Sequence, residues 1–207
     1  MLRKFVVFIL SAILSVIPSA AYAFSSVDFY NAAQGYRSVN PFGAAVHCSL
    51  ETGNWKSRLW TEGKNGAGIK ATKAWKVIGL PYIDTITEED INGEVVPQKA
   101  SFRKYSGMDQ FLRDYSRKIR DSYPVSAKYY KNIWGYLCGL YIGKYGRWAT
   151  DSRYFEKLTK VAVGLAPQIY GAKWHSKLAR QFKTAKKFNI LQKWQIGIIA
   201  EVMSRYD

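Results

Sequence analysis

The sequence predicts an α+β fold that is mostly helical and carries one small β-hairpin. Between residues 85 and 102, β-branched and acidic residues flank Asn92 and Gly93, and an Asn-Gly pair in this setting is a strong hairpin signal. From residue 106 onward, apolar residues recur at three- and four-residue spacing, as on helices with one buried face. The 207 residues are enough for one compact domain with a core of its own.

The first 23 residues are predicted to form a cleavable signal peptide. Arg3 and Lys4 precede an apolar run, and Ala-Tyr-Ala at residues 21–23 matches the small-x-small pattern of a signal peptidase site. The run is shorter than the about 20 apolar residues of a membrane-spanning helix, although an uncleaved signal anchor is the alternative. We therefore expect export to the periplasm or secretion to the cell wall. The predicted segments are a signal peptide at 1–23, a main domain at 24–170 and a basic amphipathic helical extension at 171–207.

Capping residues and prolines mark the helices of the main domain. Asn40 and Pro41 predict the start of a largely buried helix that ends at the Gly53 turn, so Glu51 falls in its last turn. Residues 58–76 lack a clear period and are predicted to form a loop. The other helices are expected at about 25–38, from a capping box at Ser106 to Pro124, at about 127–145, after Asp151, and on either side of Asn189.

The predicted hairpin holds an unusual share of acid for so basic a chain, five of its fifteen Asp and Glu residues. Successive side chains of a strand point to opposite faces, so Glu88 and Glu89 cannot both face one site unless a bulge intervenes. Pro97 marks the second strand as an edge strand or a bulged one. An exposed acidic hairpin that offsets a basic body is the alternative to a functional role.

The formal net charge of +16 predicts an anionic partner. Export and the lack of a nucleic-acid-binding motif argue against nucleic acid. Anionic envelope polymers or a membrane surface remain as partners. The basic helices after residue 171 are expected to pack on the main domain and to leave a basic outer face for that contact.

No metal and no cofactor are predicted. His47 and His175 are the only histidines, and no Cys/His cluster has ligand spacing. His47 precedes Glu51 by four residues and so shares its helix face, where a packed or supporting role is expected. Cys48 and Cys138 are compatible with an oxidising compartment, and the sequence leaves open whether they form a disulfide.

Glu51 combines a buried helix end with a neighbouring aromatic residue. Partial desolvation favours the protonated carboxyl that a general acid needs. Trp55 offers a flat apolar face of the kind on which sugar rings stack. Taken alone, the same residues also describe a helix end with a solvated Glu and a Gly cap.

Four blocks, in this order, resemble the glucosaminidase family of peptidoglycan hydrolases, glycoside hydrolase family 73. Residues 45–57 resemble the family's alanine-rich helix ending in Leu-Glu-Ser-Gly-Trp-Gly-Lys-Ser. The other blocks are Gly-Ile-Lys-Ala at 68–71, the Thr/Glu hairpin at 87–105 and Ala-Thr-Asp-Ser-Arg-Tyr at 149–154. The resemblance implies a lysozyme-like glucosaminidase fold with a β-hairpin lobe over the cleft, plus extra C-terminal helices. It also implies an endo-β-N-acetylglucosaminidase that acts on peptidoglycan glycan strands.

The resemblance also assigns roles to individual residues. Glu51 matches the catalytic acid. Glu89 matches the hairpin glutamate because it stands four residues before Gly93, and Glu88 is the alternative second carboxylate. The expected substrate-binding residues are Tyr154, which matches a tyrosine of the catalytic subsite, Trp148, Trp55 and Asn65.

The chain also departs from the family pattern. Ala67 replaces an aromatic residue, Lys64 replaces an asparagine, and Trp55 is shifted by one position. These changes affect subsite contacts and leave open a non-catalytic peptidoglycan-binding or assembly protein. A muramidase or a lytic transglycosylase on the same scaffold is the other alternative.

Overall fold

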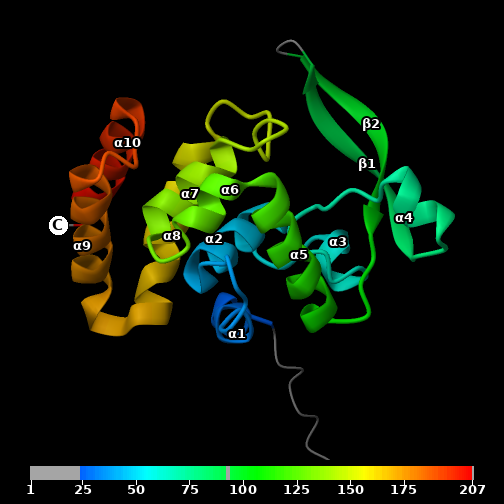
Figure 1. Cartoon of the computed structure of the whole chain (residues 1–207), viewed down its shortest axis with the longest axis horizontal. Coiled ribbons are helices and arrows are strands. Elements are labelled where there is room, and N and C mark those ends of the chain that lie inside the picture. Colours follow the sequence, from blue (N-terminus) through cyan, green and yellow to red (C-terminus); the bar gives the residue numbers. More distant parts are fainter. Residues whose placement is uncertain (1–23, 92–93, 207) are drawn as a thin grey trace, which may run out of the picture.

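The computed structural model describes residues 24–91 and 94–206, so the predicted signal peptide and the Asn-Gly turn lie outside the described residues. In this part of the chain, a body of helices carries one two-stranded antiparallel sheet (Figure 1). The elements are α1 (Ser26–Ala32), α2 (Pro41–Glu51), α3 (Arg58–Thr61), α4 (Lys73–Val77), β1 (Tyr82–Ile91), β2 (Glu94–Arg103), α5 (Met108–Ser122), α6 (Pro124–Lys128), α7 (Ile133–Tyr141), α8 (Tyr154–Tyr170), the 3-10 turn η1 (Gly171–Lys173), α9 (Trp174–Lys187) and α10 (Lys193–Ser204).

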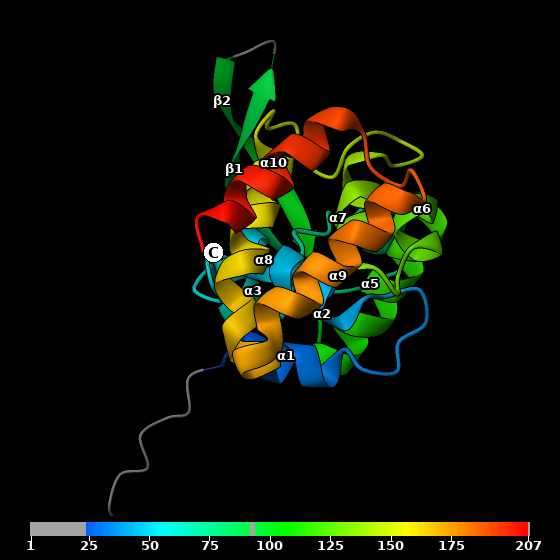
Figure 2. The ribbon, with the colours of Figure 1, turned by 90° about the vertical axis from the view of Figure 1, so that its left-hand side faces the viewer.

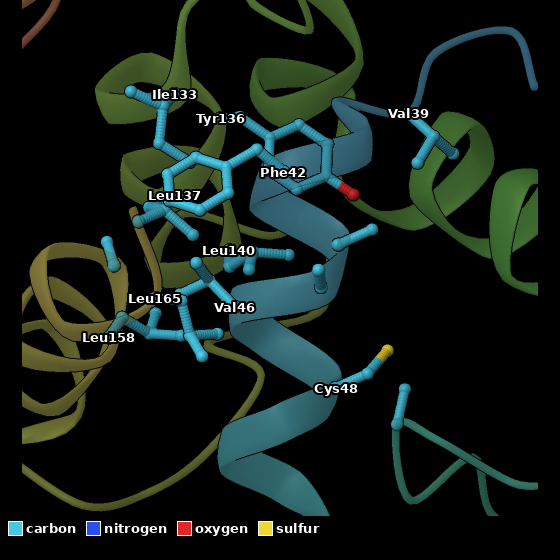
Figure 3. Packing of buried hydrophobic residues seen from close by; sticks show 14 of the residues in the cluster. Val39, Phe42, Val46, Cys48, Ile133, Tyr136, Leu137, Leu140, Leu158 and Leu165 are labelled. Carbon is cyan, nitrogen blue, oxygen red and sulfur yellow. The ribbon is translucent and has the colours of Figure 1, made fainter. Parts of the chain in front are cut away.

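Helix α2 is the central helix of the body. The Asn40 side chain caps it by accepting the Gly43 N–H at 2.7 Å, and Pro41 occupies the first turn, as predicted. Residues 42–49 are all buried, and the helix packs against α1, α7 and α8. Figure 3 shows Leu137 of α7 and Leu158 of α8 on its buried side. Gly43 permits the contact with α7, because a Cβ there would lie 2.5 Å from Cδ1 of Tyr136. This packing holds the C-terminal end of α2, and with it Glu51, in a defined place.

The hairpin is regular and is anchored at its base. β1 and β2 pair without a bulge from Tyr82 opposite Arg103 to Ile91 opposite Glu94. The cross-strand neighbours Ile83 and Phe102 are both buried against the body. Beyond this base the strands project away from the helices (Figure 1). The predicted hairpin is confirmed, and its first strand begins three residues earlier than expected.

The C-terminal helices share the core of the body. α9 and α10 pack against α7 and α8 (Figure 2), and the Leu178 carbonyl accepts a hydrogen bond from Nε1 of Trp134 at 3.1 Å. Leu178 and Ile199 are fully buried in the same cluster as α2. The prediction that these helices pack on the rest of the chain is confirmed.

Several boundaries differ from the prediction because caps and turns divide the helices more finely. α1 ends at Ala32, and Gly35 and Ser38 then adopt left-handed φ values of 85° and 65°. The stretch predicted as a loop contains α3 and α4, whose caps are the side chains of Ser57 and Thr72. Both helices are too short to leave a period in the sequence.

Two further details also differ. Asn132 caps a new helix by accepting the Gly135 N–H, so the helix expected at 127–145 is split into α6 and α7. Gly107, rather than a Ser106 capping box, precedes α5.

Both cysteines are free. Cys48 and Cys138 are buried in α2 and α7, and the Cys138 thiol lies 3.2 Å from Oε1 of Gln195. No disulfide therefore joins these two residues. Among the described residues, no helix has the length and apolar character to cross a membrane.

Candidate active site

Glu51 is a partly buried carboxylate at the C-terminal end of α2, with a side chain that is 21% exposed. Thr52 shapes the turn that follows. Its hydroxyl donates to the Cys48 carbonyl at 2.7 Å and accepts the Trp55 N–H at 2.9 Å. The last turn of the helix is thereby fixed, and the carboxylate lies at the edge of the packed body.

Tyr154 holds one oxygen of this carboxylate. Its hydroxyl donates a hydrogen bond to Oε1 of Glu51 at 2.6 Å. Tyr154 is the first residue of α8 and is only 3% exposed. Burial, and next the negative charge of Glu51, raise the pKa of the Tyr154 hydroxyl well above its usual value. Tyr154 is therefore a neutral donor throughout the neutral pH range.

The turn at Gly68 leaves space beside the second oxygen of Glu51. Gly68 has a left-handed φ of 57°, a conformation that favours glycine. A Cβ there would lie 3.7 Å from Oε2 of Glu51 and 3.8 Å from Cε1 of Phe102. The glycine thus keeps a side chain out of the space between the end of α2 and the base of the hairpin.

His47 lies one turn before Glu51 on α2 and is fully buried, as predicted. Its Nδ1 is 2.8 Å from the Tyr115 hydroxyl, which in turn is 2.9 Å from the Tyr136 hydroxyl. Its Nε2 is 3.7 Å from Oε1 of Glu51. A buried series of polar contacts therefore runs from Tyr136 of α7 through Tyr115 of α5 and His47 to the Glu51 carboxylate.

Trp148 lies beside this group. Its Nε1 donates to the Ala67 carbonyl at 3.2 Å, which ties the loop before α8 to the Gly68 turn. Its ring packs edge-on against His47 at 4.4 Å and tilted against Tyr123 at 4.7 Å, and the Lys118 ammonium lies 5.5 Å from its centroid. Much of the ring is thus covered by protein, and the half-buried remainder is what a sugar could contact.

Burial also shifts the pKa values of three groups around Glu51 and Trp148. Burial first and the charge of Glu51 second raise the pKa of Tyr123 to about 12 and raise that of the Cys48 thiol. Burial, and next the nearby Arg103, lower the pKa of Lys118. Within the described part of the chain, none of these three groups forms an ion pair with Glu51.

Trp55 is part of the core. It is 6% exposed, its Nε1 donates to the Ser26 hydroxyl at 2.9 Å, and its ring stacks on Phe29 with centroids 4.9 Å apart. Phe24 and Trp60 close around it. The prediction that Trp55 stacks on a sugar is wrong, because three aromatic rings pack around the side chain and only 6% of the residue is exposed.

Asn65 is also structural. It is fully buried, and its amide nitrogen donates to the carbonyls of Ile69 at 3.0 Å and Arg103 at 2.8 Å. Its Oδ1 accepts the Ile69 N–H at 3.0 Å. The prediction of a substrate contact is wrong here too, since Asn65 instead ties the Gly68 turn to the end of β2.

Glu88 and Glu89 lie near the outer end of β1, opposite Pro97 and Val96 of β2. Their side chains are not part of what the structure describes. Because the ladder has no bulge, the two positions fall on opposite faces, and position 89 has the same parity as the buried Ile83 at the base.

Sequence reasoning missed three residues of this site, Tyr115, Tyr123 and Lys118. All three come from α5 or from the residue after it, and their spacing is that of an ordinary amphipathic helix. In the described part of the chain, no three His, Cys, Asp or Glu side chains are close enough together to hold a metal ion.

The comparisons with known proteins agree with this architecture. Residues 27–166 match the family model described as mannosyl-glycoprotein endo-beta-N-acetylglucosaminidase. A mutant of a peptidoglycan hydrolase from Sphingomonas sp. A1 is 26% identical, with a TM-score of 0.52 over 75% of this chain and 97% of that chain. Among curated proteins, none is similar enough in sequence to count as a match.

Two more distant structures are similar in fold alone. The catalytic domain of the autolysin Auto from Listeria monocytogenes is 19% identical, with a TM-score of 0.52 over 72% of this chain and 82% of that one. An N-acetylmuramoyl-L-alanine amidase from Staphylococcus aureus is 20% identical, with a TM-score of 0.54 over 70% of this chain and 40% of that one. The predicted mostly helical fold with a small hairpin is confirmed.

Proposed function

Because this chain belongs to the glucosaminidase family of glycoside hydrolases, we propose that it is an exported peptidoglycan hydrolase with Glu51 as its general acid. The bond cleaved is the N-acetylglucosaminyl β-1,4 bond of the wall glycan, as in an endo-β-N-acetylglucosaminidase. Its substrate is the glycan strand of peptidoglycan. The structural relative from Sphingomonas sp. A1 is named as a peptidoglycan hydrolase, which supports the choice of polymer.

One observation carries the proposal: Glu51 is a partly buried carboxylate with one oxygen held and space beside the other. Oε1 accepts the Tyr154 hydroxyl at 2.6 Å, and Gly68 leaves the side of Oε2 open. Glycosidic cleavage needs a protonated carboxyl on the leaving-group oxygen and a means of stabilising an oxocarbenium-like transition state. Oε2 is the oxygen that can carry the proton to the substrate, while the bond from Tyr154 stabilises the carboxylate left behind.

Glu89 is proposed as the second carboxylate. Its position shares a ladder face with Ile83 and Phe102, and Phe102 borders the same Gly68 space as Oε2 of Glu51. For Glu89 to reach a sugar near Glu51, the outer hairpin must close over the cleft, as a lid does. There it would activate water or stabilise the positive charge, unless the N-acetyl group of the substrate assists instead.

The test of the general acid is Glu51→Gln, made in the mature chain and assayed on purified peptidoglycan. Export is tested separately, by mass spectrometry of the exported protein, whose N-terminus should be Phe24. We expect a loss of at least about 100-fold in muropeptide release, because the amide has no proton acidic enough to transfer to the leaving group. The fold should be unchanged, with the same melting temperature within a few degrees. Glu62→Gln is the matched control, since Glu62 is an exposed glutamate one helix further along, paired with Arg58.

The products identify the reaction. New reducing ends on N-acetylglucosamine support the proposal. Reducing N-acetylmuramic acid would indicate a muramidase, and an anhydro-muramic end would indicate a lytic transglycosylase; either contradicts the proposed bond. Binding to sacculi with no release of muropeptides by the unmodified protein would indicate a wall-binding or assembly protein.

The basic surface of α9 is proposed to hold the enzyme on anionic envelope polymers. Between Trp174 and Lys187 there are five Lys and Arg residues and no Asp or Glu. Within the described residues, none of these five forms an ion pair with an acidic side chain, and four of them are exposed. An uncompensated basic face attracts polyanions or an anionic membrane surface, and the attraction weakens as salt screens it.

A further inference from the structure

His47 is a fully buried histidine whose second ring nitrogen has no hydrogen-bond partner among the described residues. Nδ1 is engaged with the Tyr115 hydroxyl at 2.8 Å, whereas Nε2 is buried and unpaired. The nearest acidic atom is Oε1 of Glu51, at 3.7 Å from Nε2. A buried polar atom without a partner costs stability, so its retention beside the acid needs an explanation.

We propose that His47 is a positioning residue that donates a hydrogen bond from Nε2 to Glu51 once the Glu51 proton has passed to the leaving group. This inference rests on the proposed role of Glu51 as the general acid. It adds a donor on α2 itself, one helical turn before the acid, to the donor that Tyr154 supplies from α8.

The hydrogen bonds behind His47 can hold the required tautomer. If the Tyr136 hydroxyl donates to Tyr115, then the Tyr115 hydroxyl is free to donate to Nδ1. The imidazole then carries its proton on Nε2, on the side of Glu51. Burial raises the pKa of Tyr115 and of Tyr136, so both hydroxyls keep their protons. In this arrangement, the hydroxyl hydrogens of Tyr136 and Tyr115 and the Nε2 hydrogen of His47 each point to the next group in the direction of Glu51.

The geometry requires only a small movement. A hydrogen bond between Nε2 and Oε1 needs a separation near 3.0 Å, so a shift of about 0.7 Å from the present 3.7 Å is enough. Oε1 already accepts from Tyr154, but a carboxylate oxygen has two lone pairs and accepts two donors. A full negative charge on Glu51 after proton transfer would draw the two groups together.

No other neighbour of Glu51 is suited to this role. Tyr154, Tyr123 and Cys48 have pKa values raised by burial and by the charge of Glu51, so they stay neutral. Lys118 contacts the Trp148 ring and has no hydrogen bond to Glu51. Among these groups, His47 is the one with a buried nitrogen that faces Glu51 and has no other hydrogen-bond partner.

Two substitutions separate this role from packing. In His47→Gln, the amide nitrogen takes about the place of Nε2, so the donor toward Glu51 is kept. In His47→Asn, the shorter amide takes about the place of Nδ1, so the contact with Tyr115 is kept and the donor toward Glu51 is lost. Both are polar and smaller than histidine, which makes them a matched pair.

The measurement is the pH dependence of muropeptide release, with melting temperatures taken in parallel. The alkaline limb of the profile reports loss of the proton from the general acid. Without the Nε2 donor the carboxylate is less stabilised, so the acid holds its proton to higher pH. We expect the limb of His47→Asn to move up by about one pH unit, since a hydrogen bond to a charged group has an effect of that size. His47→Gln should stay within about 0.3 units of the unmodified enzyme.

Either of two results would overturn the inference: an unmoved limb in His47→Asn, or equal movement in both variants, which would mean packing alone. Tyr115→Phe is a third variant, which leaves the imidazole in place but removes the hydroxyl that orients it. We expect it to move the limb upward by less than His47→Asn does. If it leaves the limb unmoved, the orienting chain is not needed and the proposed tautomer control is wrong.

Failure of the proposed function can be told apart from failure of this inference. If the unmodified chain releases no muropeptides, the proposed function fails. The Glu51 carboxyl can still be titrated by carbon-13 NMR in the unmodified protein and in His47→Asn. The same upward shift of about one unit is then expected, and identical titration curves would contradict the contact.

Discussion

At the scale of single residues, Tyr154 is the donor that holds Glu51 in the folded protein. Tyr154→Phe removes one hydroxyl and leaves the ring in place in a site that is only 3% exposed. We expect the rate of muropeptide release to fall about 10- to 100-fold, because a hydrogen bond to a charged group contributes about 1.5–3 kcal/mol. The turnover number, measured beside the melting temperature, checks this.

Tyr170→Phe is the control, since it makes the same change at the other end of α8, beside Tyr30 and Phe42 and away from the acid. Activity of Tyr154→Phe within twofold of the unmodified enzyme would mean that the Tyr154 hydroxyl does not act on the reacting carboxylate.

The same residues show what a sequence can reveal about a site. Glu51 and His47 could be assigned to one helix face from their spacing, because four residues make about one turn. Tyr154, 103 residues further on, was found only through the family resemblance. Asn65 was misassigned because its partner, the Arg103 carbonyl, lies 38 residues away, and no local signal reports that the turn folds back onto β2.

At the scale of elements, the hairpin is where the second carboxylate is proposed. The unbroken register sets Glu88 and Glu89 on opposite faces, and only position 89 shares a face with the buried Ile83. We therefore expect Glu89→Gln to lose about 100-fold in activity while Glu88→Gln stays within about twofold. The two variants have the same charge and differ by one position, so each controls for the other in turbidity assays on peptidoglycan.

The reverse result, loss in Glu88→Gln alone, would mean that the outer hairpin changes its register or twist when it binds glycan. Unchanged activity in both would assign charge stabilisation to the N-acetyl group of the substrate and would remove Glu89 from the mechanism.

The elements themselves were predictable to the extent that local signals define them. The Asn-Gly turn and the cap at Asn40 are properties of a few adjacent residues, and the hairpin and α2 are confirmed. α3 and α4 were missed because four or five residues cannot display a helical period. The break between α6 and α7 depends on Asn132, which also donates to the Gln181 carbonyl of α9, a contact that exists only in the folded chain.

At the scale of the whole molecule, the helices after residue 170 complete the core and carry the basic face. Leu178 and Ala185 of α9 are fully buried, while Arg180, Lys183 and Lys187 are exposed on the same helix. The amphipathic pattern predicted both faces, but it could not say which helices would cover the apolar one. In the structure, α7 and α8 cover the apolar face of α9 (Figure 2).

The basic face predicts salt-sensitive binding that is separate from catalysis. The double substitution Lys183→Glu and Lys187→Glu reverses two exposed charges on α9. Each basic residue near an anionic surface contributes about 1 kcal/mol, so binding to sacculi that retain their anionic polymers should fall at least tenfold at low salt. Raising the salt should reduce the difference between the variant and the unmodified protein, because screening removes the interaction that the variant lacks. Co-sedimentation across a salt series measures both effects.

The matched control carries the same charge change at the other end of the molecule. Lys73 of α4 and Lys104, the residue after β2, are exposed. α4 lies on the hairpin side of the molecule, away from α9 (Figure 1). If Lys73→Glu with Lys104→Glu weakens binding as much as the α9 pair, then net charge alone drives association and α9 has no special part.

Turnover on soluble muropeptide chains separates binding from chemistry, and it should be unchanged in the α9 variant because Glu51 and Tyr154 are untouched. Vesicles with anionic lipid, tested beside sacculi, distinguish a wall polymer from a membrane surface. If α9 contacts a wall polymer, the α9 variant should lose more binding to sacculi than to the vesicles.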